Sequence, residues 1–169
     1  MAKKIIWSVV FIMAAALLQS TVFRRLEIYF HAIPDLALCI LVYSSYVNGA
    51  MTGQLTGFFS GVLLDFLSSA PLGLNSFIRT LIGGSAGFMK GTFYLDSFFL
   101  PMALCAVATI FKAVIYYLLH ILFAEDIPFY AVFELTFWVE LGMNTLLAPP
   151  LFAFLRLFHP LLAGARENG

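Results

Sequence analysis

The chain has 169 residues, of which 62% are hydrophobic and only 11% are charged. Its mean hydropathy is +0.98, whereas an ordinary soluble domain carries roughly 25% charged residues. This composition excludes a soluble globular core and predicts an all-α integral membrane protein. The formal net charge is zero, which removes the usual electrostatic argument for binding nucleic acid. The lipid bilayer is therefore the only partner that the composition implies.

Six apolar segments follow one another along the chain, and each is interpreted as a membrane-spanning helix of a polytopic bundle. A span needs about 20 mostly apolar residues, so six spans use about 120 residues and leave no room for a separate soluble domain. The third and fourth segments are short for spans. We expect one transmembrane domain over residues 1–169, with spans at about 5–23, 34–47, 53–67, 73–89, 98–123 and 132–158.

Basic residues near the segment ends predict the orientation of this bundle, because Lys and Arg are enriched on the cytoplasmic side of membrane proteins. An even number of spans puts both termini on one side, and we expect that side to be the cytoplasm. Arg24 and Arg25 then lie outside, against the rule. The basic residues that lie inside or at the inner interface are Lys3, Lys4, Lys90, Arg156 and Arg166.

A ladder of small residues marks the third segment. Gly53, Gly57, Gly61 and Asp65 recur at every fourth position, so they lie along one face of the predicted helix. Small residues let helices approach closely in a membrane, where lipid supplies no hydrophobic drive for helix association. Two interpretations stay open: the face packs inside the bundle, or it receives the transmembrane helix of a partner protein.

Two pairs of opposite charges are expected inside the membrane. Asp65 and Arg79 lie close to the short turn that joins the third and fourth segments, and an unpaired charge at the centre of a span costs at least about 2.5 to 3.5 kcal/mol. Counted from the loop between the fifth and sixth segments, Lys112 and Glu140 also lie at similar depth, with Asn144 on the face of Glu140. The Asp65–Arg79 pair is expected to be structural, whereas Lys112 with Glu140 is either a structural ion pair or part of a buried acid–base or transport relay.

Recognisable reaction sites are missing from the sequence. The glycine-rich stretch at 83–87 lacks the spacing and the Lys-Ser/Thr ending of a phosphate-binding loop. Its letters, GGSAG, fit G-x-S-x-G, but the stretch lies inside a predicted helix and not at the strand-to-helix turn of a nucleophile elbow, and no H-E-x-x-H motif occurs. Cys39 and Cys105 lie in apolar runs, and no Cys or His has the spacing of a metal site. We expect neither enzymatic activity nor a metal or other cofactor.

Three stretches of the sequence form a pattern. Pro34-Asp35-Leu36 opens the second segment, and residues 57–68 combine glycines with a Leu-Asp step before Leu72-Gly73-Leu74. The last segment contains the run NTLLAPPLF, which begins at Asn144. Together these stretches resemble the MreD family of rod shape-determining proteins over most of the chain, from Ile33 to Arg156. The family's motif positions are then Pro34, Asp35, Gly73, Asn144 and Arg156.

This resemblance implies a non-enzymatic scaffold of the cell-elongation machinery in the bacterial cytoplasmic (inner) membrane. Such a protein is expected to bind membrane-anchored MreC and, directly or indirectly, MreB, the RodA glycosyltransferase and its penicillin-binding partner. It would thereby help to organise side-wall peptidoglycan synthesis and cell shape. On this basis, the face of Gly53, Gly57, Gly61 and Asp65 is a hypothesis for the surface that receives the single helix of MreC.

Two other functions remain open. A substrate-capture subunit of an energy-coupling-factor-type vitamin transporter is also a compact bundle of about six helices. It would need a polar pocket near the outer face, for which Asn75 and Glu140 are available. A membrane-embedded enzyme would instead use Asp65 or Glu140 as an acid or base. Thermal stabilisation by a vitamin favours the first function, and loss of turnover on Glu140→Gln favours the second.

Overall fold

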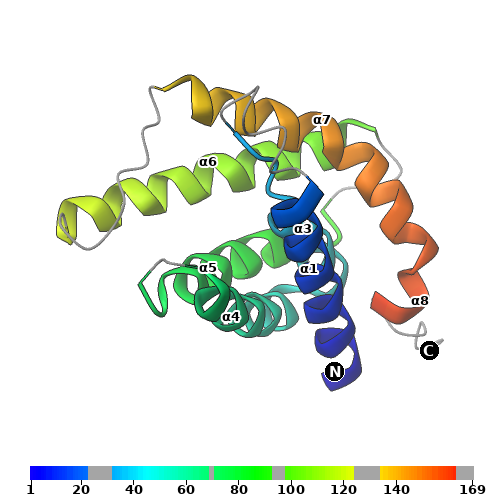
Figure 1. Ribbon diagram of the computed structural model, residues 1–169. Coiled ribbons are helices and arrows are strands. Elements are labelled where there is room, and N and C mark those ends of the chain that lie inside the picture. Colours follow the sequence, from blue (N-terminus) through cyan, green and yellow to red (C-terminus); the bar gives the residue numbers. More distant parts are fainter. Residues whose placement is uncertain (23–31, 69–70, 93–97, 124–133, 163–169) are drawn as a thin grey trace.

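The computed structural model describes residues 1–22, 32–68, 71–92, 98–123 and 134–162. Within these ranges the chain is helical and has no strand, in agreement with the expected fold class. The helices are shown in Figure 1. In chain order they are α1 (Ala2–Val22), α3 (Leu36–Asn48), α4 (Ala50–Leu67), α5 (Leu74–Phe88), α6 (Phe99–Leu122), α7 (Leu135–Leu157) and the short α8 (His159–Leu162).

The first six of these helices coincide with the six predicted segments to within a few residues, and α8 is an addition to them. Three helices in the described part of the chain, α1, α6 and α7, are long and apolar enough to cross a membrane. The 13 residues of α3 rise about 20 Å at 1.5 Å per residue, less than a hydrocarbon core of roughly 30 Å. The described part of the chain is thus helical and contains three candidate membrane spans, but the number of six spans is not confirmed.

The predicted orientation depends on residues that lie outside the described ranges. Arg24, Arg25 and Arg166 are among them, as are Phe23 and residues 132–133, at the ends of the first and last predicted spans. The cytoplasmic position of both termini therefore stays a prediction.

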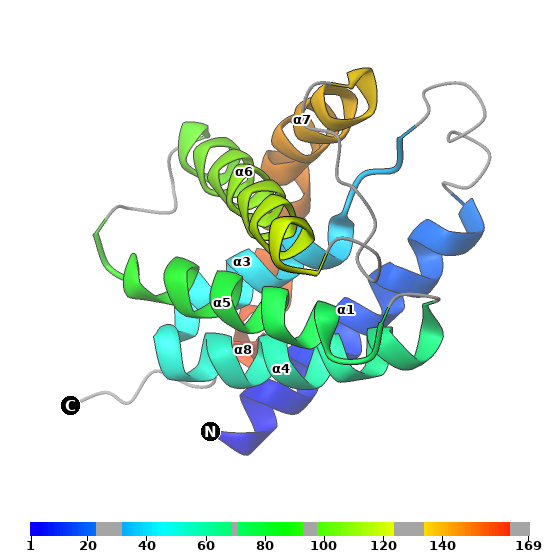
Figure 2. The ribbon, with the colours of Figure 1, turned by 90° about the vertical axis from the view of Figure 1, so that its left-hand side faces the viewer.

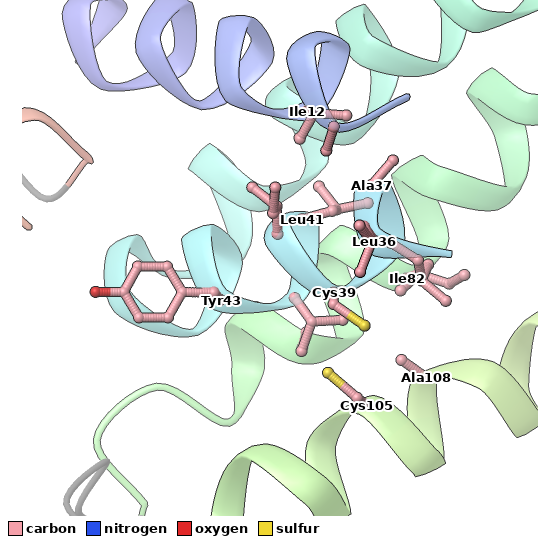
Figure 3. Close-up of a cluster of buried hydrophobic side chains, with 14 of the residues drawn as sticks. Ile12, Leu36, Ala37, Cys39, Leu41, Tyr43, Ile82, Cys105 and Ala108 are labelled. Carbon is pink, nitrogen blue, oxygen red and sulfur yellow. The ribbon is translucent and has the colours of Figure 1, made fainter. Parts of the chain in front are cut away.

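Helix α3 forms the centre of the molecule, in contact with α1, α4, α5, α6 and α7 (Figure 2). All its residues from Leu36 to Tyr46 are buried, as expected of a helix that is apolar on every side. In Figure 3 the side chain of Ile12 lies beside α3, and the sulfur atoms of Cys39 and Cys105 face each other. The core is therefore built around the shortest of the predicted spans.

Helices α4 and α5 pack antiparallel and lie side by side in Figures 1 and 2. A Cβ atom at Gly53 would collide with the carbonyl oxygen of Gly83, and one at Gly57 with the carbonyl oxygen of Arg79. Gly61 meets the backbone of α5 in the same way. Of the two interpretations left open for this face, internal packing is the one observed. Because α5 covers the face, it is not available to a helix of MreC or of another partner.

We predict that Gly57→Ala destabilises the protein by about 1 to 3 kcal/mol, the usual cost of overpacking a tight contact. Denaturant unfolding in detergent, followed by helical circular dichroism, measures this change. Gly142 in α7 is the matched control, because a Cβ there meets nothing within 4 Å. Gly142→Ala should be neutral or slightly stabilising, since Ala is the better helix former. Equal stabilities of the two variants would contradict the close contact.

Candidate functional site

Four charged side chains from four elements meet in a buried chain of alternating sign. Asp35 Oδ1 accepts a hydrogen bond from Arg79 Nη2 at 3.2 Å, and its Oδ2 accepts one from Lys112 Nζ at 2.9 Å. Lys112 Nζ also donates to Glu140 Oε1 at 2.8 Å. All four side chains are between 8% and 15% exposed. Their formal charges sum to zero, so each buried ion has an opposite neighbour. We call this set the charge network.

Asp35 takes its position from the start of α3. Its Oδ1 accepts a hydrogen bond from the backbone N–H of Leu38 at 2.9 Å, which satisfies one of the unpaired donors of the first helical turn. The ring of Pro34, just before it, restricts the local backbone. One carboxylate therefore caps the central helix and binds two cations. This gives a physical reason for the Pro-Asp motif at the start of this segment.

Asn144 ties α7 to the same point. Its Oδ1 accepts a hydrogen bond from the backbone N–H of Asp35 at 2.7 Å, and its Nδ2 donates to Thr109 Oγ1 at 3.0 Å. Thr109 Oγ1 in turn donates to the carbonyl oxygen of Cys105 at 2.8 Å. Asn144 and Thr109 are fully buried, and a buried amide without such partners would be costly. The amide thus links α3, α6 and α7.

Arg79 pairs with Asp35 rather than with Asp65, so the predicted Asp65–Arg79 pair is wrong. Asp65 is buried and accepts hydrogen bonds from the backbone N–H groups of Gly73, Asn75 and Ser76 at 2.9 to 3.2 Å. The side chains of Asn75 and Ser76 donate to it as well. The positive end of α5 therefore stabilises this carboxylate, and no cation is needed.

The predicted approach of Lys112 to Glu140 is present, whereas the place of Asp35 between the two cations was not expected. The sequence feature that could have indicated the role of Asp35 is its place just before an apolar helix, where Asp is a preferred cap.

Gly73, another motif position, has a φ of 94° at the start of α5, a conformation that suits glycine. Arg156 lies exposed in the last turn of α7, away from the network.

A cavity of about 510 Å³ lies beside the charge network. Leu17, Leu64 and Leu67 contribute to its apolar wall. Asn75 and Glu140, which the sequence offers for a polar pocket, both line it. Among the described residues, no three or more of His, Cys, Asp and Glu group as metal ligands would. The polar lining consists of Gln19, Ser20, Asp35, Ser68, Asn75, Arg79, Lys112 and Glu140.

A family model for the rod shape-determining protein MreD matches residues 1–158 of the chain. The chain belongs to the MreD family. No curated protein and no solved structure matches it. The matched range includes the charge network, the cavity and the α4–α5 contact, and the family gives the protein a role in determining rod shape. The comparisons do not support the vitamin-transporter alternative.

A double-mutant cycle separates the observed ion pair from the one expected from the sequence. Asp35→Asn leaves an excess positive charge in the core, and Arg79→Gln in the same chain restores neutrality. We therefore expect the two substitutions to couple by about 0.5 to 3 kcal/mol in denaturant unfolding. Asp65→Asn should couple more weakly with Arg79→Gln, because Asp65 is stabilised by α5 itself. A stronger coupling of Arg79 with Asp65 would contradict the observed pairing.

Proposed function

We propose that this MreD-family protein is a non-enzymatic scaffold of the bacterial cytoplasmic membrane, which binds MreC and organises the elongation complex. The observation that carries the proposal is the family match over residues 1–158. MreB, RodA and its penicillin-binding partner join the complex through direct or indirect contacts. Both termini lie in the cytoplasm. The arrangement of charges supports this role, because the four charged side chains of the network pair with one another inside the bundle. The outer faces of the helices are left apolar.

The contact with MreC has to lie on a surface other than the glycine face of α4, since α5 covers that face. An apolar groove at α4 and α5 is lined by the aromatic rings of Phe58, Phe66 and Phe77, and the small residues Gly73 and Thr80 also line it. Small residues in a groove let a single helix approach closely, which is the main source of helix association in lipid. We place the helix of MreC in this groove.

Phe66→Ala with Phe77→Ala should lower the MreC recovered with the affinity-tagged protein by about tenfold, the effect of losing roughly 1.4 kcal/mol of packing. The matched control is Phe99→Ala with Phe154→Ala. These two rings are exposed to similar extents, 76% and 51% against 73% and 51% for the test pair. The control variant should recover MreC normally. Undiminished recovery with the test variant would place the contact elsewhere.

The role in cell shape is tested by depletion of the protein in a rod-shaped host. Loss of the protein should round the cells, because side-wall synthesis loses its organisation, and re-expression should restore rods. Light microscopy of cell length and width measures the change, and affinity purification of the re-expressed protein should recover MreC. Cells that stay rod-shaped throughout depletion would contradict the scaffold role.

The charge network has a structural role in this proposal, and a paired substitution distinguishes this role from a relay. Lys112→Met or Glu140→Met alone leaves an uncompensated charge in the core and should lower the membrane level of the protein, since breaking a buried pair costs about 3 to 5 kcal/mol. Lys112→Met with Glu140→Met removes one charge of each sign. This double variant should restore both the level, measured by immunoblot, and rod shape. A double variant that accumulates but leaves cells round would favour a relay.

A further inference from the structure

The structure assigns a ligand to the cavity beside the charge network: we propose that it binds the phosphodiester headgroup of a membrane phospholipid. The cavity volume of about 510 Å³ lies within the range of ligand sites, roughly 300 to 1,000 Å³. The inference goes beyond the scaffold role and does not depend on MreC. It rests on one buried cation, on the pairing of the surrounding charges and on the exposed leucines of the apolar wall.

Arg79 is the residue that calls for a ligand. It is 7% exposed, it lines the cavity, and its Nη2 binds Asp35. Its other terminal nitrogen, Nη1, is buried and has no hydrogen-bond partner among the described residues. A buried charged donor without an acceptor is costly. The oxygens of a phosphate match the planar fork of a guanidinium better than any other common group except a carboxylate.

The other charged side chains of the network do not compete with Arg79 for an anionic ligand. Lys112 is held between Asp35 and Glu140 at 2.9 and 2.8 Å, so both carboxylates already face a cation. The network is neutral as a whole, and an anion at Arg79 therefore meets no net negative charge from it. Among the charged groups that line the cavity in the described part of the chain, the guanidinium of Arg79 is the one with a buried donor that has no acceptor.

The apolar wall favours a lipid over a free phosphate ion. Leu17 of α1 and Leu67 of α4 line the cavity and are also 55% and 61% exposed. Both leucines therefore present apolar area that the described part of the chain does not cover, and that lipid can contact. A phospholipid can place its headgroup against Arg79 while its acyl chains lie along these leucines. A free ion would gain nothing from them.

Native mass spectrometry of the full-length protein in detergent tests this assignment, with phosphatidylglycerol, phosphatidylethanolamine and diacylglycerol as probes. The wild-type protein should retain either phospholipid and lose diacylglycerol. Arg79→Lys keeps a cation for Asp35 but removes the second donor nitrogen, and should weaken retention by about tenfold, as expected for one charge-assisted hydrogen bond. Equal retention of diacylglycerol, or loss of both phospholipids from the wild type, would overturn the proposal.

Ser20→Trp supplies a second variant, in case Arg79→Lys does not fold. Ser20 is exposed and lines the cavity without belonging to the network, so the indole should fill the cavity and weaken retention to a similar extent. Lys90→Gln is the control, since it removes an exposed cation that does not line the cavity, and retention should be unchanged. Retention that none of the variants alters would overturn the site. A rise in melting temperature with inorganic phosphate alone would assign it to a free ion instead and overturn the lipid.

Discussion

The carboxylate of Asp35 is the interaction on which the rest of the structure depends. It caps the central helix α3 and binds Arg79 of α5 and Lys112 of α6, and through Lys112 it connects to Glu140 of α7. An uncompensated charge in a low-dielectric core costs several kcal/mol. Few arrangements of these four helices give every buried ion an oppositely charged partner. The observed arrangement does so within one connected network. Charge pairing thus restricts the packing of helices whose apolar side chains alone would allow many alternatives.

The glycine face and the charge network act together through α5. Asp65 binds the first turn of α5, and Gly57 packs directly on the backbone of Arg79. The close approach of α4 therefore sets where the guanidinium lies relative to Asp35. A bulkier residue at Gly57 would displace the cation as well as the helix. The two motifs that the sequence shows separately, small residues and buried ions, are two parts of one arrangement.

Much of the secondary structure was predictable because Pro, Gly and charged residues bound long apolar runs. The approach of Lys112 to Glu140 was predictable too, since both flank one loop. The partners of Arg79 and Asp65 were not. Asp35 is separated from Arg79 by 44 residues and from Lys112 by 77, so no local spacing relates them. A prediction that pairs only charged side chains also omits the backbone N–H groups at the start of α5, which donate hydrogen bonds to the carboxylate of Asp65. The number of six spans is not confirmed, since a run such as α3 is buried in protein and its apolar composition alone does not show that it spans the membrane.

A network of this kind contributes specificity more than stability. Buried ion pairs seldom exceed apolar packing in stabilising a fold, but a mismatched arrangement that strands one ion is strongly disfavoured. In a bilayer this selection matters more, because lipid tails solvate apolar helix faces as well as another helix does. The scaffold role proposed above requires outer faces that keep one relative placement. Under that proposal, the ions inside the bundle maintain the shape of the apolar surface that the partners would recognise.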